Sequence, residues 1–237
     1  MTTARQRSAE KAGFRYFEVP LACGATGKEW VCPQHGNILS VERAVLSHLE
    51  REGWRGFWGE GGLLLNLIKC MSFQELPLHH RLTYIEAIYA QNIAFDREKV
   101  PVKRLLSALL QATPAQVQRN FALMLDRGPF VTKLGPITST STGSVHDFFP
   151  GLEPWMLVEL FQVAGHDLLH RIAFTFARDP YEYRRGWPDL TVWREGQLRF
   201  IEVKAPGDSL GKNQKTIAAT FGASLGLDFS LAAVVPA

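Results

Sequence analysis

The chain has 237 residues, of which 46% are hydrophobic and 21% are charged. These proportions are typical of folded globular proteins and exclude a disordered, collagen-like or coiled-coil chain. The 26 basic and 23 acidic residues leave a formal net charge of +3, so a polyanion would have to be recognised through local charge. The length suits one large domain or two small ones.

The first forty residues contain few signals of regular structure. Residues 1–15 are basic with no apolar stretch behind them, which predicts a solvated or frayed end and no signal peptide. Residues 20–37 are rich in glycine, proline and cysteine and predict a loop. We therefore divide the chain into an N-terminal extension and loop over residues 1–37 and one domain over residues 38–237.

An amphipathic helix and a glycine-rich turn are expected next. Ser40 is a typical N-cap, and apolar residues recur at a spacing of four behind it, so the pattern predicts a helix over residues 41–52. Gly53 ends that helix. Residues 56–62 contain four glycines and predict a tight turn, and an apolar helix is expected at about residues 62–71.

The middle of the chain is expected to be helical, as an insertion over about residues 73–180. Three of its segments begin with a proline, a residue that is favoured at the first position of a helix. The predicted helices cover residues 79–95, 101–112, 114–126 and 154–177. A stretch rich in serine, threonine and glycine at residues 137–144 predicts a loop.

The pattern changes to strands after Gly186. Two strands joined by a short hairpin connection are followed by a helix that Ser209 is expected to cap, and by a last strand. The predicted strands cover residues 190–193, 198–204 and 229–235, with the connection at 195–197 and the helix ending at about residue 224. Together with the helical body, this tail predicts an α/β core that carries a helical insertion.

Three charged residues of the tail are expected to share one face of the hairpin. Asp189 opens the first strand, and Glu202 and Lys204 lie two residues apart on the second, on one side because a strand has a period of two. The separation of 202 − 189 = 13 residues lets the hairpin fold Asp189 back onto Glu202. The alternative is an ordinary surface ion pair, but apolar neighbours would half-bury the trio, which favours a functional site.

Two carboxylates and an ammonium group suit hydrolysis of a phosphodiester. Mg²⁺ prefers oxygen ligands and usually keeps several waters. The phosphate needs its charge neutralised, an attacking water oriented in line and its leaving oxygen stabilised. The carboxylates would hold the metal, and the lysine would orient the metal-bound water or lower its pKa.

The pattern P-D-x12-E-V-K resembles the PD-(D/E)xK nuclease superfamily. The string E-V-K-A-P-G-D-S-L that starts at Glu202, with Gln214 on the next helix, closely resembles the VRR-NUC (virus-type replication-repair nuclease) domain. Further upstream, Val41-Glu42 and Gly59-Glu60-Gly61 look like the start of the nuclease domain in the Fanconi-anaemia-associated nuclease family. In that family a helical insertion separates this glutamate from the Pro-Asp motif, and here the gap is 189 − 60 = 129 residues.

The resemblance spans about residue 38 to the end and implies a PD-(D/E)xK restriction-endonuclease-like core, a small mixed sheet flanked by helices with a large helical insertion. It implies a ligand set for Mg²⁺ or Mn²⁺, a catalytic lysine and a glutamine beside the site. In this sequence the ligands are Glu60, Asp189, Glu202 and the backbone carbonyl of Val203, the lysine is Lys204 and the glutamine is Gln214. We interpret Glu42 as a carboxylate at a helix N-terminus and not as a ligand; a turn carboxylate near a helix N-terminus is the rival interpretation of Glu60.

The activity that the resemblance implies is that of a structure-selective DNA nuclease in DNA repair, a phosphodiesterase I-type hydrolase that cuts 5′ flaps and trims from 5′ to 3′. The expected partner is branched or flapped DNA. The larger family members carry DNA-binding and helical-repeat domains before the nuclease, where this chain has about forty residues, so an accessory DNA-binding protein is a further expected partner. We expect a monomer. Two alternatives stay open: a dimeric endonuclease like Holliday-junction resolvases, and a non-catalytic DNA-binding or adaptor module.

Basic residues flank the predicted site on both sides. Arg184 and Arg185 precede the Pro-Asp motif, and Lys212 and Lys215 lie on the helix after it. These side chains are candidates for contacts with DNA phosphates. A solvated basic face is an equally good interpretation of any one of them.

The cysteines indicate a reducing compartment, because their number is odd in a mid-sized chain. Cys23, Cys32 and His35 have the spacing C-x8-C-x2-H, which lacks a second close pair and a clear fourth ligand, so reduced cysteines in a loop are favoured over a zinc site. The sequence has no apolar run of membrane-spanning length. We therefore expect a cytoplasmic protein, associated with the nucleoid in a bacterium, with no contact to a membrane.

Other possible metal or phosphate motifs are incomplete. His166 and His170 share one helix face but lack the glutamate of the H-E-x-x-H motif, and we interpret them, like the histidines at 79–80, as structural or solvated. The glycine-rich residues 59–62 do not have the spacing of a phosphate-binding loop.

Overall fold

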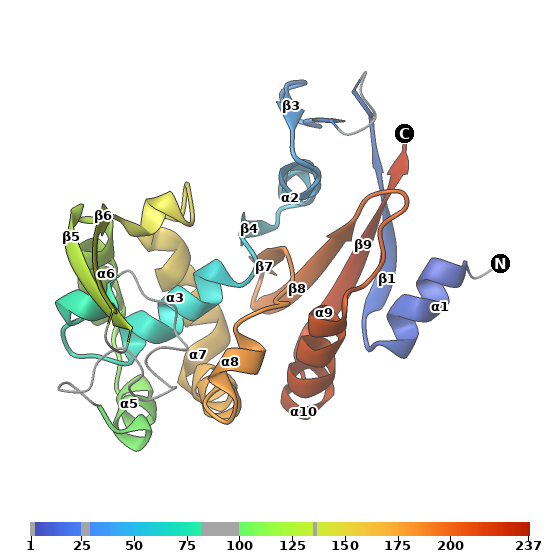
Figure 1. The fold of residues 1–237 in the computed structure, drawn as a ribbon. Coiled ribbons are helices and arrows are strands. Elements are labelled where there is room, and N and C mark those ends of the chain that lie inside the picture. Colours follow the sequence, from blue (N-terminus) through green and yellow to red (C-terminus); the bar gives the residue numbers. More distant parts are fainter. Residues whose placement is uncertain (1–2, 25–28, 82–99, 135–136) are drawn as a thin grey trace. The chain divides into compact units, whose positions relative to one another are not determined.

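The computed structural model describes residues 3–24, 29–81, 100–134 and 137–237 (Figure 1). It divides into two compact units. The first consists of Met1–Gly61 and Arg185–Ala237, and we call it the sheet unit. The second is Gly62–Arg184, which we call the helical unit. Within the described residues no helix is both long and apolar enough to cross a membrane.

The sheet unit is built from both ends of the chain. Its elements are α1 (Ala4–Lys11), β1 (Arg15–Leu21), β2 (Trp30–Val31), β3 (Ile38–Leu39), α2 (Val41–Arg51), β4 (Arg55–Trp58), β7 (Leu190–Arg194), β8 (Gln197–Lys204), α9 (Lys212–Ile217), a π-helical turn η3 (Ala218–Gly222), α10 (Ala223–Leu225) and β9 (Asp228–Pro236). Five strands form one mixed sheet in the order β1-β9-β8-β7-β4. Strand β9 is parallel to both β1 and β8, and β7 is antiparallel to both β8 and β4.

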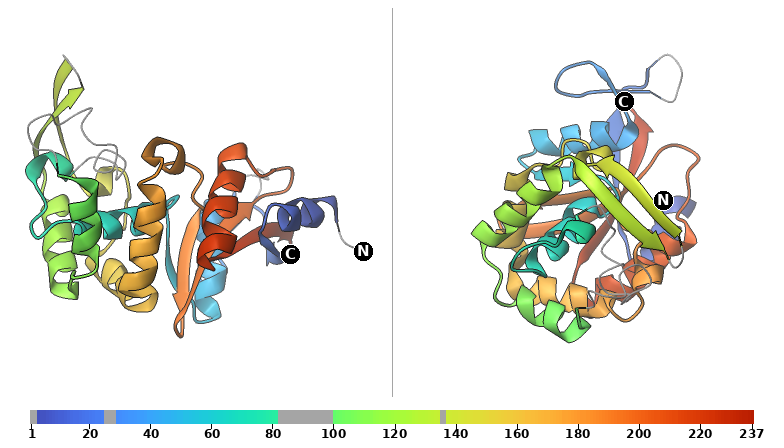
Figure 2. Two further views of the ribbon diagram at one scale, coloured as in Figure 1. Left: turned by 90° about the horizontal axis from the view of Figure 1, so that it is seen from below. Right: turned by 60° about the vertical axis from the view of Figure 1, so that its left-hand side comes forward.

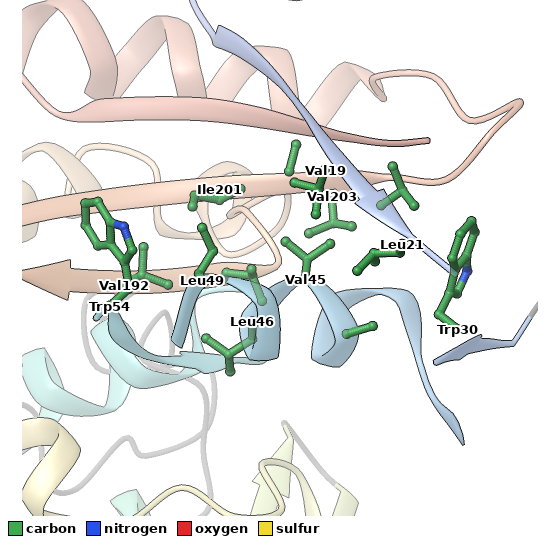
Figure 3. Packing of buried hydrophobic residues seen from close by; sticks show 14 residues of the cluster. Val19, Leu21, Trp30, Val45, Leu46, Leu49, Trp54, Val192, Ile201 and Val203 are labelled. Atoms are coloured by element: carbon green, nitrogen blue, oxygen red, sulfur yellow. The ribbon is translucent and has the colours of Figure 1, made fainter. Parts of the chain in front are cut away.

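Helix α2 packs on one face of this sheet. Ser40 caps it by accepting a hydrogen bond from the amide of Arg43, and its apolar side carries Val45 and Leu49. These side chains pack between the helix and strand β8, which carries Ile201 and Val203 (Figure 3). Burying this apolar stripe contributes about 25 cal/mol for each Å² removed from water. Because strand side chains alternate, the residues of β8 that alternate with Ile201 and Val203 must point to the opposite face of the sheet.

The opposite face of the sheet carries aromatic residues. Phe200 alternates with Ile201 along β8 and stacks on Phe229 of β9, with ring centroids 5.4 Å apart. Trp187, in the segment before β7, contacts Phe200 at 5.9 Å and Phe221 of the π-helical turn at 4.8 Å. Since strand side chains alternate, Glu202 shares the face of Phe200, the face on which the α9 segment packs.

The helical unit combines helices with a β-hairpin. Its described elements are α3 (Gly62–Met71), the 3₁₀ turn η1 (Leu78–His80), α5 (Val102–Leu109), α6 (Pro114–Leu125), β5 (Gly128–Leu134), β6 (Ile137–Gly143), the 3₁₀ turn η2 (Val145–Asp147), α7 (Pro154–Phe176) and α8 (Pro180–Tyr183). Strands β5 and β6 pair in antiparallel register, as the right-hand view of Figure 2 shows. Helix α7 is broken at Gly165, whose φ of +70° is outside the helical range.

Buried amides join α6 to the end of α3. The side-chain Nδ2 of Asn120 donates to the carbonyl oxygens of Cys70 at 2.8 Å and Phe73 at 2.7 Å. Its Oδ1 accepts from the amide of Leu76 at 2.9 Å. Gln116 donates to the Phe73 carbonyl at 2.6 Å. These bonds satisfy carbonyls that α3 leaves open at its C-terminus and so hold the helices together.

Most predicted helices and strands are confirmed within a few residues. The helices α2, α3, α5, α6 and α7 and the strands β7, β8 and β9 lie where the sequence places them. The helix predicted at 79–95 falls largely outside the described residues, and its first positions lie in η1. The mixed α/β character of the fold is confirmed.

Four local predictions are wrong. Residues 137–144, predicted as a loop, contain β6, because serine and threonine also suit a strand that pairs along a hairpin. The stretch at 56–62 begins within β4, where Gly56 lets the backbone lie against β7: a Cβ there would meet the carbonyl oxygen of Thr191 at 2.6 Å. Gly211, and not Ser209, is the N-cap of α9. The supposed frayed end contains α1, and β1 follows as a strand paired along β9.

Candidate active site

The register of β7 and β8 sets the position of the two central carboxylates. Leu190 pairs with Ile201, so Asp189, one residue before the strand, stands opposite Glu202. The Oδ2 of Asp189 accepts a hydrogen bond from the backbone amide of Val203 at 2.8 Å. This bond fixes the orientation of the aspartate carboxyl beside Glu202.

Glu202 is the most buried charged group of the site, with 1% of its surface exposed. Its Oε1 accepts two bonds, from the ammonium group of Lys204 at 2.7 Å and from the side-chain amide of Gln214 at 2.5 Å. Its Oε2 is buried and receives no hydrogen bond from the described residues. The structure thus brings together Asp189, Glu202, Lys204 and Gln214, all four from positions that the sequence singled out.

Gln214 joins the site to the helix behind it. Its Oε1 accepts a hydrogen bond from the amide of Gly211 at 2.7 Å, which is the cap of α9. Its Nε2 donates to Glu202. The side chain of Gln214 therefore bonds both to the N-cap of α9 and to the carboxylate of Glu202. Gly186 allows the chain to pass close to this helix: a Cβ there would meet the backbone of Asn213 at 2.4 Å.

Burial raises the pKa of both carboxyl groups, Asp189 and Glu202. Desolvation, together with the charge of Asp189, raises the pKa of Glu202 from 4.5 to about 8. Desolvation also raises the pKa of Asp189 from 3.8 to about 6, against the opposing effect of the Val203 amide bond. The ammonium group of Lys204 lowers both pKa values but does not compensate for burial. Such raised acid pairs are typical of functional sites.

Glu42 contributes to this electrostatic environment from α2. It lies in the first turn of that helix, as the sequence interpretation had it. Its charge also raises the pKa of Asp189, after burial, which is the larger cause. The sequence analysis did not predict this effect of Glu42 on Asp189, because no local sequence pattern shows which strand will lie near the N-terminus of a helix.

Glu60 lies in the turn after β4. The amide of Gly59 donates to the backbone carbonyl of Asp189 at 2.9 Å, which ties this turn to the start of β7. Glu60 is exposed and has a φ of +39°, which is uncommon for a residue other than glycine. Among the described residues no three histidine, cysteine or acidic side chains gather where they could hold one metal ion. A ligand role for Glu60 therefore stays a prediction.

The four basic candidates are divided between the two units. Arg185 belongs to the sheet unit and is exposed, and Lys212 and Lys215 are exposed on α9. Arg184 belongs to the helical unit, where its guanidinium lies 5.3 Å from the ring centroid of Tyr181. Their predicted contacts with DNA phosphates stay predictions.

The other motifs have ordinary surroundings. His166 shares a 2.8 Å hydrogen bond with the carbonyl of Ala112 and contacts the ring of Phe161 edge-on, which fits a structural role. The Cys32 sulfur contacts the Ser47 hydroxyl at 3.2 Å, whereas Cys23 is exposed. In the described part of the chain, neither set belongs to a group of three metal-binding side chains.

A divalent cation fits the Asp189–Glu202 pair. Glu202 offers a buried oxygen that receives no hydrogen bond from the described residues, and Asp189 offers a second carboxylate oxygen beside it. Both are hard oxygen donors of the kind that Mg²⁺ and Mn²⁺ prefer. Burial raises the pKa of both groups, and the charge of Asp189 raises that of Glu202 further. A bound cation would offset both effects.

A known family model matches the C-terminal part of the chain. Residues 151–236 match the family model of the VRR-NUC domain, a range that includes α7, the Asp189–Lys204 hairpin and α9. The resemblance inferred from the sequence is thereby confirmed.

Two proteins with similar sequences are Fanconi-associated nuclease 1 homologs. The chain is 23% identical to the one from Schizosaccharomyces pombe over 188 residues, which are 76% of this chain and 25% of that protein. It is 24% identical to the one from Oryza sativa subsp. japonica over 211 residues, 83% of this chain and 20% of that protein. The chain thus spans about a quarter or less of the length of these relatives.

Solved structures of paFAN1 share the fold. The crystal structure of paFAN1 bound to 2nt 5′ flap DNA with gap matches with a TM-score of 0.59 and 17% identity, over 94% of this chain and 38% of that one. The structure with 1nt 5′ flap DNA matches with the same TM-score and coverage at 19% identity. At these identities the likeness concerns the fold.

Proposed function

We propose that this chain is a metal-dependent DNA nuclease of the PD-(D/E)xK type. The observation that carries the proposal is the buried Asp189–Glu202 pair with Lys204 and Gln214 on Glu202. A structural ion pair would not need a second carboxylate beside it, and two buried carboxyl groups with raised pKa values destabilise the protein unless a cation joins them. The VRR-NUC match over residues 151–236 supports the same chemistry.

The residues have separate tasks in the proposed reaction. A divalent cation, when bound, neutralises phosphate charge and lowers the pKa of a water. Asp189 and Glu202 would hold it, with the carbonyl of Val203 and the Glu60 carboxylate as further proposed ligands. The ammonium of Lys204 lies 2.7 Å from Oε1 of Glu202. In the proposed reaction it orients the attacking water and stabilises the negative charge that develops on the phosphate oxygens. Gln214 keeps the Glu202 carboxylate in one orientation.

Glu60 enters this proposal through its backbone. Its φ of +39° places a glutamate where glycine is favoured, and Gly59 and Gly61 beside it also have positive φ. Strain of this kind is retained when the surrounding structure requires it and clusters at functional sites. The residue directly before Glu60, Gly59, donates its amide to the Asp189 carbonyl at 2.9 Å, which supports a place for Glu60 near this carboxylate.

The proposed substrate is DNA with a 5′ flap or another branch. The support is that paFAN1 was solved with 5′ flap DNA and shares the fold. We propose 5′ flap cleavage with 5′ to 3′ trimming, in DNA repair. Exposed Arg185, Lys212 and Lys215 would contact the phosphates beside the cut, together with Arg184.

A cleavage panel tests the proposal. Labelled 5′ flap, nicked, single-stranded and four-way-junction DNA are incubated with the protein in Mg²⁺, Mn²⁺ or EDTA. We expect cleavage of the flap with either cation and none in EDTA. Lys204→Ala should lower the cleavage rate about 100-fold or more and leave DNA binding within about twofold. Lys11→Ala, which removes an exposed lysine of α1, is the matched control.

Three outcomes would change the assignment. Cleavage that persists in EDTA, or a fully active Lys204→Ala, refutes the proposed mechanism. Preferred cutting of the four-way junction by a protein of dimeric mass supports the junction-resolvase alternative. Binding of branched DNA without cleavage under any condition supports a non-catalytic module.

A further inference from the structure

The loop between β8 and α9 connects the two sides of the candidate site. It leaves the strand directly after Lys204 and reaches the helix whose first turn carries Gln214. Both of these side chains bond to the same oxygen of Glu202. A shift of this loop would therefore move two of the groups that orient the central carboxylate.

The first half of the loop is a closed turn. The amide of Ala205 donates to the Oδ2 of Asp208 at 3.1 Å, and the amide of Asp208 donates to the carbonyl of Ala205 at 3.1 Å. Gly207 allows the tight bend with a φ of +96°. These bonds fix the turn internally, and the Ala205 carbonyl can still accept a second hydrogen bond through its other lone pair.

Arg5 of helix α1 contacts two carbonyls of this turn. Its Nη2 donates to the Ala205 carbonyl at 3.1 Å and lies 3.4 Å from the Asp208 carbonyl, and the side chain is half-buried. Two hundred residues of sequence separate Arg5 from Ala205. A cation that bridges two carbonyls of one turn holds it more firmly than a neutral donor would, since charge-assisted hydrogen bonds are stronger.

Helix α1 is itself fixed to the sheet. Thr3 caps it, and Ala9 at its inner side is fully buried. Phe14, directly after it, is buried against the ring of Phe229 at 5.9 Å, and β1 then pairs along β9. Arg5 therefore contacts the loop from a helix that is packed on the sheet unit.

We propose that Arg5 is a positioning residue of the active site: it holds the Ala205–Asp208 turn and thereby the placement of Lys204 and Gln214 on Glu202. The inference rests on the proposed nuclease function and adds α1 to the elements that the reaction requires. A misplacement of about 1 Å of a catalytic group lowers rates by up to about 100-fold. Because the turn keeps its internal bonds, we expect about a tenfold loss for Arg5→Ala.

The experiment compares four variants with the wild type: Arg5→Ala, Arg5→Lys, Asp208→Ala and the control Lys11→Ala. The readouts are kcat and KM on 5′ flap DNA with Mn²⁺, the midpoint of thermal unfolding, and amide hydrogen exchange without DNA or metal. We expect Arg5→Ala to lower kcat about tenfold with KM within twofold. Exchange should become faster over residues 204–214 and stay unchanged in β1 and β9.

The other variants separate positioning from its rivals. Arg5→Lys keeps one cationic donor and should recover part of the lost kcat. Asp208→Ala opens the same turn without touching α1 and should reproduce the kcat loss and the local exchange. Lys11→Ala should match the wild type in every readout.

Each contrary result overturns the inference. A raised KM with unchanged kcat would make Arg5 a DNA contact. Faster exchange throughout β1 and β9 with unchanged kcat would make it a purely structural residue. Wild-type exchange over residues 204–214 in Arg5→Ala would refute the role whatever the activity. If the wild type cleaves no DNA, the proposed nuclease function fails, whereas the exchange data still decide whether Arg5 holds the turn.

Discussion

Replacing Glu202 by glutamine should make the cation-free protein more stable at pH 8 and change its stability by less than about 1 kcal/mol at pH 5. The glutamate is buried and faces the Asp189 carboxyl, and these two causes raise its pKa to about 8. Glutamine has the same shape and carries no charge. Its carbonyl can still accept from Lys204 and Gln214, and its amide can donate to Asp189, where Glu202 presents an oxygen without a hydrogen bond from the described residues.

The sign follows from proton binding. Between pH 4.5 and about 8 the folded wild type keeps a proton on Glu202 that the unfolded chain has released. The free energy of unfolding therefore falls as the pH rises through this window, and the contribution of the protonated group is complete only below pH 4.5. The neutral variant lacks this dependence. The two proteins should have equal stability at low pH and separate progressively toward pH 8.

The size of the effect follows from the same interval. A pKa raised from 4.5 to about 8 corresponds to about 5 kcal/mol at about 1.4 kcal/mol for each pKa unit. Part of this belongs to the charge of Asp189, whose own pKa is raised to about 6 chiefly by burial. We expect Glu202→Gln to gain about 2–4 kcal/mol over the wild type at pH 8.

Urea unfolding in EDTA at pH 5 and pH 8 measures the difference. Glu10→Gln, the same change at an exposed site of α1, should show no gain at either pH. Adding Mg²⁺ at pH 8 should then stabilise the wild type and not Glu202→Gln, because only the folded wild type offers both carboxylates. A wild type more stable than Glu202→Gln at pH 8 in EDTA would refute the reasoning, since the Lys204 ion pair would then outweigh burial.

Three further predictions concern the surroundings of the site. Gln214→Ala should lower kcat about tenfold with little change in KM, because Glu202 loses one of the two bonds to its Oε1; steady-state kinetics checks this. Replacing Arg184 and Arg185 by alanine should weaken DNA binding and flatten its salt dependence, and an unchanged salt slope in binding titrations would count against phosphate contacts. Gly56→Ala should cost about 1–3 kcal/mol in urea unfolding, because the new Cβ would meet the neighbouring strand at 2.6 Å.

Sequence reasoning succeeded where the chemistry is local. The hairpin, its connection at Glu195-Gly196 and the two-residue spacing of Glu202 and Lys204 could be predicted, because strand periodicity and turn residues are set by near neighbours. Helix boundaries at Ser40 and Pro114 were equally readable from capping preferences.

It failed where distant segments decide the structure. Helix α1 has a low apolar content, and its position depends on tertiary contacts such as the burial of Ala9 and the bonds of Arg5 to a turn two hundred residues away. The influence of Glu42 on Asp189 is of the same kind, because it depends on how α2 packs across the sheet.

The sequence by itself therefore determined the ingredients of this protein: two carboxylates and a lysine on one hairpin face, with a glutamine on the next helix. The tertiary structure decided what these groups are physically. It removed Glu202 and Asp189 from water, set them opposite each other and left one oxygen of Glu202 without a hydrogen bond from the described residues. Burial raises the pKa of both groups, and a bound cation would offset its cost. Burial and charge proximity are properties of packed elements, and no local pattern of residues can specify them.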